Sequence, residues 1–307
     1  MSNLPMGFAE MFRKSAYAYR KNFAKLFVPL LLFQLVLLVP LMFFTMPGTV
    51  SVARSVLLTL SQTGGSSLNS VLGVLAIVLC IAVFLSPLMV SNVVYVIDSD
   101  YNSREITFKD AAAHAKKRYG SMLRSYFAII VLMIPVILLI GGVVGVGTFV
   151  DGVLSQTLAP DEIVAVVLLG LLALFMLFGI VFVPYVVAIQ GKAGFRAVFT
   201  SYRYAFLGNF WSNFTRILTA AVIVALGGVF INWLSQLPFA ELYELYLVDP
   251  MLALQNPLMI FVILLALGAI VVITLIFPFW YAFSYNTYQN AKYEYEKKYP
   301  QKERDNV

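Results

Sequence analysis

Long runs of apolar residues alternate with short polar segments along the whole chain. Six uncharged runs are long enough to cross a bilayer, because about 18 or more apolar residues in a helix span the hydrocarbon. A helix is suited to this environment since it satisfies its own backbone hydrogen bonds. The second, fourth and sixth runs exceed the bilayer thickness, so we expect them to tilt, kink or project beyond it. The predicted spans are Leu26–Met46, Asn69–Ile97, Tyr126–Val150, Ile163–Ile189, Ile217–Phe239 and Leu258–Tyr285.

A segment with the pattern of an amphipathic helix precedes the first, third and fifth runs. Each segment has a first aromatic residue and further apolar residues 4, 11 and 15 positions on, which fall within one arc of a helix, with basic residues elsewhere. Such a helix either lies in the headgroup region of a membrane or packs on the neighbouring spans, and the pattern fits both. The predicted aromatic face comprises Phe8, Phe12, Tyr19, Phe23, Phe108, Tyr119, Phe195, Phe199, Phe206 and Phe210.

The chain therefore repeats one unit three times, a surface helix followed by two spans. The repeats cover approximately residues 7–98, 107–190 and 194–290 of a single integral membrane domain, 1–299, and residues 300–307 are predicted to be a disordered tail. Because each unit crosses the membrane twice, all three units enter in the same direction, which makes them parallel repeats. The predicted fold is all-α, a polytopic membrane protein with six transmembrane helices.

Each unit carries a proline in its second span, at Pro87, Pro184 and Pro278, and these positions are 97 and 94 residues apart. A proline removes one backbone hydrogen bond and bends a helix. We therefore expect helix kinks at the three sites. Such kinks either fit the helices into a crowded bundle or open a central cavity between them.

Composition and charge agree with a membrane protein and give its orientation. The chain is 61% hydrophobic and 12% charged, which excludes an ordinary soluble domain. Every Lys and Arg except Arg54 falls on one side of the predicted spans, so both termini are predicted to be cytoplasmic. The first apolar run does not have the form of a cleavable signal peptide. A single cysteine, Cys80, allows no intramolecular disulfide.

The basic residues of the surface helices form a rim at the cytoplasmic side. Each Lys or Arg near an anionic leaflet contributes about 1 kcal/mol to membrane binding. The rim is therefore a candidate binding surface for anionic lipid headgroups, although basic residues also fix orientation without binding anything. The possible contacts are Arg13, Lys14, Arg20, Lys21, Lys116, Lys117, Arg118, Lys192, Arg196 and Arg203.

The residue types of common active sites are scarce or isolated. His114 is the only histidine, which excludes histidine clusters for metals and disfavours a Ser-His-Asp arrangement. The six runs contain no Asp, Glu, Lys or Arg, which disfavours proton-coupled transport. We predict no catalytic, cofactor or metal site and no nucleic-acid partner. The sequence does not decide whether the chain binds a protein partner or forms a homo-oligomer.

Residues 182–214 carry an aliphatic run with Pro184, a turn at Gly191-Lys192, an aromatic helix and Asn209-Phe210 before the next span. This order resembles a group of bacterial six-span membrane proteins. The group includes the YciC-type inner-membrane proteins and the membrane domain fused to some glycerophosphoryl diester phosphodiesterases. The resemblance implies a multi-pass protein of the bacterial cytoplasmic membrane. It transfers no enzymatic residue, because a separate soluble domain does the chemistry in the fused relatives.

Two functions fit these observations. The first is a non-enzymatic membrane protein that acts in envelope or lipid homeostasis or serves a membrane partner. The second is a transporter or channel for a small or lipidic solute, through a cavity between proline-bent helices. A bundle filled with bulky side chains favours the first function, and a continuous polar-lined cavity favours the second.

Overall fold

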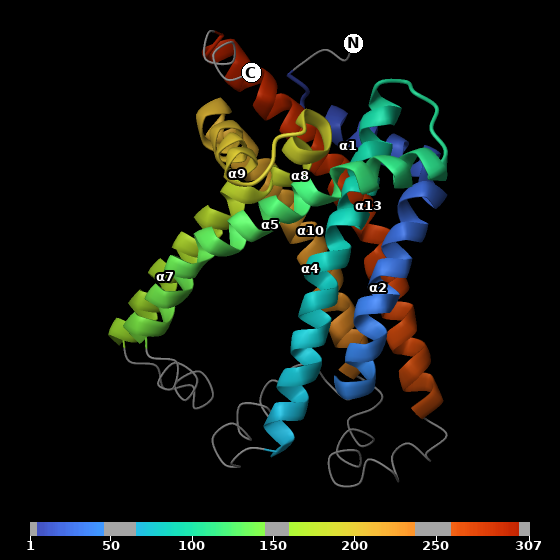
Figure 1. Cartoon of the computed structure of the whole chain (residues 1–307), viewed down its shortest axis with the longest axis vertical. Helices are drawn as coiled ribbons and strands as arrows, with labels where there is room; N and C mark the ends of the chain where they lie inside the picture. Colours follow the sequence, from blue (N-terminus) through green and yellow to red (C-terminus); the bar gives the residue numbers. More distant parts are fainter. Residues whose placement is uncertain (1–4, 46–65, 145–159, 237–258, 301–307) are drawn as a thin grey trace. The chain divides into compact units, whose positions relative to one another are not determined.

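The computed structural model describes residues 5–45, 66–144, 160–236 and 259–300, and these ranges consist of helices joined by short turns, with no strand (Figure 1). This confirms the all-α prediction. The predicted tail lies outside the described residues except for Pro300. The helices are α1 (Phe8–Lys21), α2 (Phe23–Thr45), α4 (Ser66–Tyr101), α5 (Phe108–Val144), α7 (Pro160–Ile180), α8 (Val183–Tyr185), α9 (Phe195–Tyr202), α10 (Phe210–Gln236) and α13 (Met259–Lys298), with π-helical segments η1 (Val186–Gln190) and η2 (Arg203–Gly208).

Two helical stretches have the length and apolar composition to cross a membrane, Val83–Tyr101 and Gly170–Gln190. A shorter apolar stretch covers Phe23–Val36. These results refer to the part of the chain whose side chains are described. They support a membrane protein in general terms, while the six spans and their threefold repeat stay predictions.

Two asparagines separate a surface helix from the helix that follows it. Asn22 ends α1 with φ −110°, and Asn209 ends η2 with φ −137°, so neither residue is helical. Asn side chains favour such joints because they bond to nearby backbone. Asn22 donates to the Ala18 carbonyl over 3.3 Å, and Asn209 accepts from the Ser212 N–H over 3.4 Å. In α5, which has no asparagine at the corresponding place, the surface helix and the next helix are continuous.

The start of α5 is fixed by a reciprocal cap between Thr107 and Asp110. The Asp110 carboxylate accepts from the Thr107 N–H and hydroxyl over 2.9 and 2.7 Å, and the Asp110 N–H donates to Thr107 Oγ1 over 3.2 Å. These bonds satisfy donors that a helix start leaves unpaired. They also lower the pKa of Asp110. A Thr-x-x-Asp sequence thus sets where the second surface helix begins.

The helix that carries Pro184 is interrupted, whereas Pro87 and Pro278 lie inside continuous helices. α7 ends at Ile180, and α8 begins at Val183, with two residues between them. The Ser201 hydroxyl bridges the interruption, because it donates to the Gly179 carbonyl over 2.6 Å and accepts from the Phe182 N–H over 3.2 Å. The three prolines therefore occupy two different local settings.

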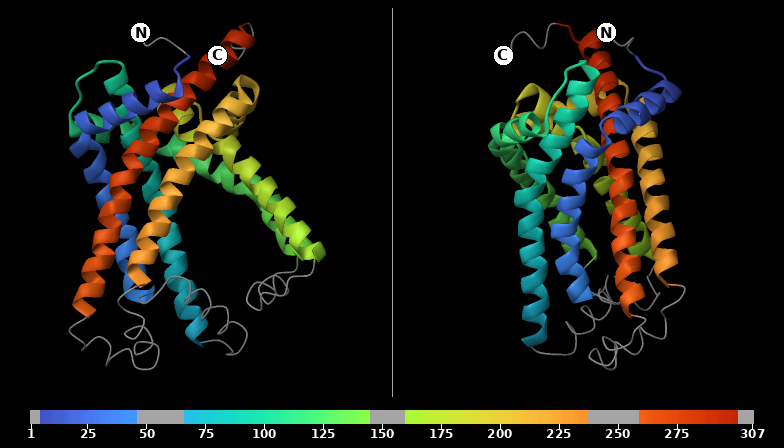
Figure 2. Two further views of the ribbon diagram at one scale, coloured as in Figure 1. Left: turned by 180° about the vertical axis from the view of Figure 1, so that it is seen from behind. Right: turned by 90° about the vertical axis from the view of Figure 1, so that its right-hand side faces the viewer.

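The chain divides into two compact units. The first comprises Met1–Asn22, Pro87–Ala220 and Tyr281–Val307, and in it α5 and α7 pack side by side while α9 contacts both (Figure 1). The second comprises Phe23–Ser86 and Ala221–Trp280. In the second unit α2 runs alongside the adjoining parts of α4 and α13 (Figure 2). The two described ends of the chain belong to the first unit.

Candidate functional site

The last part of α13 is the most buried helix segment of the first unit. All residues from Ala282 to Tyr288 are buried, as are Asn290, Ala291 and Tyr295. A helix that is buried on all sides must lie at the centre of its unit. We call the segment Tyr281–Tyr295, together with the side chains that it contacts, the α13 hub.

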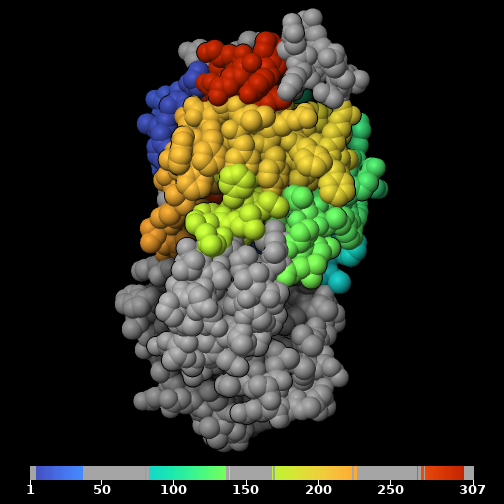
Figure 3. Space-filling view, turned by 90° about the vertical axis from the view of Figure 1, so that its left-hand side faces the viewer, coloured from blue at the N-terminus to red at the C-terminus, as the bar shows by residue number. Residues whose placement is uncertain are grey.

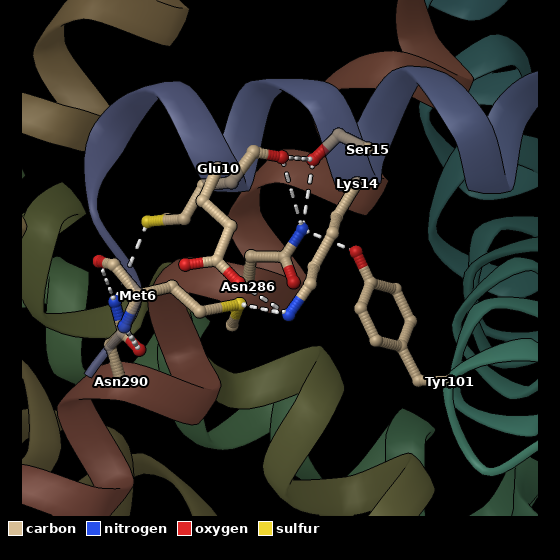
Figure 4. Close-up of polar contacts among 8 residues, drawn as sticks. Met6, Glu10, Lys14, Ser15, Tyr101, Asn286 and Asn290 are labelled. Carbon is tan, nitrogen blue, oxygen red and sulfur yellow. Dashed lines mark hydrogen bonds and ion pairs between the residues drawn. The ribbon is translucent and has the colours of Figure 1, made fainter. Parts of the chain in front are cut away.

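Two asparagines of the hub hold the N-terminal segment against α13 (Figure 4). Asn290 bonds to both backbone groups of Met6: its Oδ1 accepts from the N–H over 3.0 Å, and its Nδ2 donates to the carbonyl over 2.9 Å. Arg216 of α10 donates to the same Met6 carbonyl over 3.2 Å. A side-chain amide presents the same donor and acceptor as a peptide group, so Asn290 replaces a missing backbone partner.

Asn286 lies one helical turn before Asn290 and joins three helices. Its Nδ2 is 2.8 Å from Ser15 Oγ of α1 and 2.5 Å from Tyr101 Oη of α4. Its Oδ1 is buried and has no partner within the described residues. Ser15 donates in turn to the Met11 carbonyl over 2.7 Å. Buried amides that are bonded in this way specify which helices meet.

A cluster of buried tyrosines fills the space between α13 and η1, η2 and α8. Tyr185, Tyr204, Tyr285 and Tyr288 are nearly inaccessible, and the Tyr185 and Tyr288 rings stack with 5.6 Å between centroids. Gln190 of η1 donates to the Tyr288 and Tyr204 hydroxyls over 2.7 and 3.0 Å. Burial raises the pKa of Tyr288 well above its ordinary value. The centre of the first unit is thus filled by bulky side chains.

Each acidic side chain near the hub has its own bonding partner within the protein. Asp98 accepts from the Tyr285 hydroxyl over 2.8 Å, and Asp100 pairs with Lys21 over 2.7 Å. Asp110 serves the cap of α5. No group of His, Cys, Asp and Glu suited to a metal ion occurs among the described residues. Each of these carboxylates therefore has a structural explanation.

His114 connects α5 to α4 and η1. Its ring stacks on Tyr95 with 3.9 Å between centroids, and its Nε2 lies 3.1 Å from the Ala188 carbonyl. Because a carbonyl can only accept, Nε2 carries the proton. Burial lowers the pKa of His114, more than the bond to Ala188 raises it, and the nearby Arg118 lowers it further.

Stability is expected to fall as the pH is lowered from about 7.5 to about 5. The unfolded chain binds a proton at His114 near pH 6.5, whereas the folded protein, with its lowered pKa, binds it at lower pH. The neutral ring therefore stabilises the fold above the unfolded pKa, and this contribution is lost as the pH falls through that value. Thermal unfolding in detergent at several pH values measures the effect. His114→Gln keeps a donor for Ala188 and removes the titration, so an equally steep loss in this variant would contradict the assignment.

The predicted aromatic face is only partly exposed. Phe8, Phe12, Phe23, Phe108, Phe195 and Phe199 are exposed, while Tyr19, Tyr119, Phe206 and Phe210 are half-buried. Phe206 and Phe210 both pack on Phe178 of α7, with centroids 5.3 and 5.5 Å away. Tyr17 of α1 and Trp211 at the start of α10 are further exposed rings that were not predicted, and Trp211 is 72% exposed. Figure 3 shows the face on which α9, η2 and the start of α10 (gold to orange) lie beside α5 (green).

Most of the basic residues predicted to contact lipid are exposed, and the others are half-buried. Arg13, Arg20, Lys21, Lys116, Lys117, Arg196 and Arg203 are exposed, and Lys14, Arg118 and Lys192 are half-buried. Two of them have acidic partners: Lys14 pairs with Glu10 over 2.8 Å, and Lys21 with Asp100. The remaining exposed residues of this set lie on α1, α5, α9 and η2.

Sequence reasoning missed the residues of the hub. Asn286, Asn290, Tyr185, Tyr204 and Tyr288 were not among the predicted site residues. One signal was available, because no charged residue occurs between Asp249 and Lys292. The uncharged stretch therefore extends beyond the predicted end of the sixth span, which is unusual for a helix in water.

Comparisons with known proteins place the chain in a family. No curated protein and no solved structure matches it. One family model matches residues 6–291, from Met6 to the residue after Asn290, and so includes the α13 hub segment as far as Ala291. The chain therefore belongs to the family described as a domain of unknown function, DUF7847.

Proposed function

We propose that this chain is a non-catalytic, multi-pass membrane protein that holds aromatic-basic helices in the headgroup region of the cytoplasmic leaflet. In this proposal six spans cross the bacterial cytoplasmic membrane, and both termini are cytoplasmic. The surface helices contact anionic lipids or a membrane partner and thereby serve envelope or lipid homeostasis. The chain then acts as a scaffold, and its likeness to the YciC-type proteins supports only the placement in the bacterial cytoplasmic membrane.

The observation that carries the proposal is the exposure of large apolar side chains next to exposed cations. Phe199 of α9 is 56% exposed and Phe195 is 47% exposed, with Arg196 exposed between them. Soluble proteins rarely leave such rings in contiguous patches facing water, whereas the headgroup region accepts both rings and cations. Leu168, Leu171 and Leu177 of α7 are also more than half exposed, as expected of a helix that faces lipid.

A second observation favours a scaffold over a transporter. The centre of the first unit is filled by Tyr185, Tyr204, Tyr285, Tyr288, Phe182 and Phe283, which are among the largest fully buried side chains. Close packing of this kind gives rigid positions to the surface helices. It supports the first of the two functions that the sequence leaves open.

Cysteine labelling tests the interfacial placement. In a Cys80→Ser background, Phe199→Cys and Arg196→Cys introduce thiols at two exposed positions of one helix. In intact membranes a membrane-impermeant maleimide is expected to label the cysteine at 196 rapidly and the cysteine at 199 much more slowly, since lipid covers only the second. After denaturation in detergent both should react. In the unmodified chain Cys80, which the protein itself leaves exposed, should stay unlabelled in membranes because lipid surrounds it.

The same method tests the orientation. Arg13→Cys and Lys116→Cys should react from one side of sealed vesicles, and Ser66→Cys, at the start of α4, from the other. Rapid labelling of Cys80 in intact membranes would contradict the membrane-spanning part of the proposal. Equal rates at positions 196 and 199 would contradict only the interfacial helix.

The transporter alternative has one observation in its favour, the interrupted helix at Pro184. Broken helices with freed backbone groups form substrate sites in many transporters. Here Ser201 already satisfies Gly179 and Phe182, which favours a structural role for the break. Solute flux into proteoliposomes that changes in a Pro184→Ala variant would support transport in place of the scaffold.

A further inference from the structure

Arg118 of α5 lies against the turn that follows η1. A Cβ atom at Gly191 would be only 2.4 Å from Arg118 Nη1, so the guanidinium occupies the space that a side chain would need. Gly191 also has a φ of +74°, in the left-handed region that favours glycine. The left-handed backbone therefore favours glycine at this position, and a side chain there would displace the guanidinium.

The Nε–H of Arg118 lacks an acceptor in the part of the chain that the structure describes. This nitrogen is also buried. The ion pairs found in the described ranges use Lys14, Lys21 and Lys292 instead. Burying a charged N–H without an acceptor is costly, and buried polar groups in proteins are normally bonded.

The nearby backbone groups that the structure describes bond to one another and not to Arg118. The Ala188 carbonyl accepts from His114, the Gly191 N–H donates to the Val187 carbonyl, and the Gly194 N–H donates to Ser125 Oγ over 2.9 Å. The charges that flank Arg118 are positive, Lys117 in the chain and Lys192 beside Gly191. The missing acceptor is therefore expected to be an anion with adjacent oxygens, which matches the planar fork of a guanidinium.

We infer that Arg118, where it lies against the turn Gly191–Gly194, binds a phosphate group, with Lys192 as an adjacent cation. The inference deepens the proposed function, since on a membrane surface the phosphate would belong to an anionic phospholipid headgroup. Free phosphate has the same chemistry, so the experiment must separate the two sources.

Hydrogen exchange of the backbone amides of residues 191–198 measures occupancy of this site. The full-length protein is compared in a phosphate-free detergent with and without inorganic phosphate. It is also compared in nanodiscs of phosphatidylcholine with and without phosphatidylglycerol. Slower exchange on addition of phosphatidylglycerol alone assigns the site to a lipid headgroup, and slower exchange with inorganic phosphate assigns it to the free anion.

Three variants make the result specific. Arg118→Ala should weaken binding of the protecting ligand by about tenfold or more, because it removes a charged hydrogen-bond donor. Arg118→Lys keeps the charge without the fork and should fall between this variant and the unmodified protein. Arg20→Ala removes one exposed charge from α1 and should leave protection at residues 191–198 unchanged.

Several outcomes would overturn the site. These are no protection under any condition, equal protection in both nanodiscs that Arg118→Ala does not reduce, or an equal loss in Arg20→Ala. Protection that needs no added anion and disappears in a Glu303→Gln, Asp305→Asn variant would show that a carboxylate of the chain occupies the site. None of these results depends on the cysteine labelling, so the site and the proposed function can fail separately.

Discussion

Replacement of Asn290 by leucine is expected to lower the free energy of unfolding of the first unit by about 1–3 kcal/mol. Leucine has a similar size but can neither accept from the Met6 N–H nor donate to its carbonyl, bonds of 3.0 and 2.9 Å in the protein. The carbonyl keeps its bond to Arg216, while the buried N–H is left unpaired. The cost of an unsatisfied buried donor exceeds the value of an ordinary hydrogen bond.

The loss should be concentrated at α1. This helix contains Arg13, Lys14, Arg20 and Lys21, so limited trypsin digestion reports directly on its release. We expect faster cleavage at these four sites in Asn290→Leu and in Asn286→Leu, which loses the bonds to Ser15 and Tyr101. The matched control is Asn102→Ala, an exposed asparagine with a single bond to the Asp98 carbonyl. Cleavage in the hub variants at the rate of this control would mean that the asparagines do not anchor α1.

A methyl group at Gly208 is expected to have an effect of comparable size. The added Cβ of Gly208→Ala would lie 2.8 Å from the Ala291 carbonyl oxygen, which belongs to the backbone of the buried part of α13. A backbone atom cannot rotate away as a side chain can, so η2 or α13 must shift. Overpacking of this kind costs about 1–3 kcal/mol. The shift would also disturb the bond that Lys298 donates to the Gly208 carbonyl.

Gly120→Ala is the matched control for this substitution. Its Cβ would meet nothing within 4 Å, and it lies inside α5, where alanine is the better helix former by up to about 1 kcal/mol. Thermal unfolding of the detergent-solubilised protein, followed by near-ultraviolet circular dichroism of the buried tyrosines, compares the two. We expect a lower midpoint for Gly208→Ala and an unchanged or higher one for Gly120→Ala. Equal midpoints would show that η2 accommodates the methyl group with no loss of stability.

The hub explains why these two substitutions act on the same unit. Asn290 and Ala291 are consecutive residues of α13, and they contact the N-terminal segment and η2 respectively. Each contact joins parts of the chain that are distant in sequence. If the surface helices do lie in the headgroup region, these contacts determine how the rings and cations of α1 and η2 are presented to lipid.

The amino-acid sequence by itself determined the helical class and several local boundaries. Continuous apolar runs without strand-like alternation predict helices, and most of the described residues are helical. The pairs Asn22-Phe23 and Asn209-Phe210 mark the two joints where one helix ends and the next begins. The sixth apolar run is longer than a bilayer requires, and α13 continues past Pro278 to Lys298. These features depend on near neighbours in the chain, which is why a single sequence reveals them.

Only the tertiary structure decided which segment is central. The sequence drew attention to residues 182–214, whereas the most buried helix segment of the first unit is the last part of α13. The bonds that make it central join Asn290 to Met6 and Asn286 to Ser15, more than 270 positions apart. No local pattern encodes such a pairing, because the sequence around an Asn or Tyr does not indicate whether water or another helix surrounds its side chain. The acceptor-free setting of the Arg118 Nε–H likewise exists only because folding brings α5 to the turn after η1.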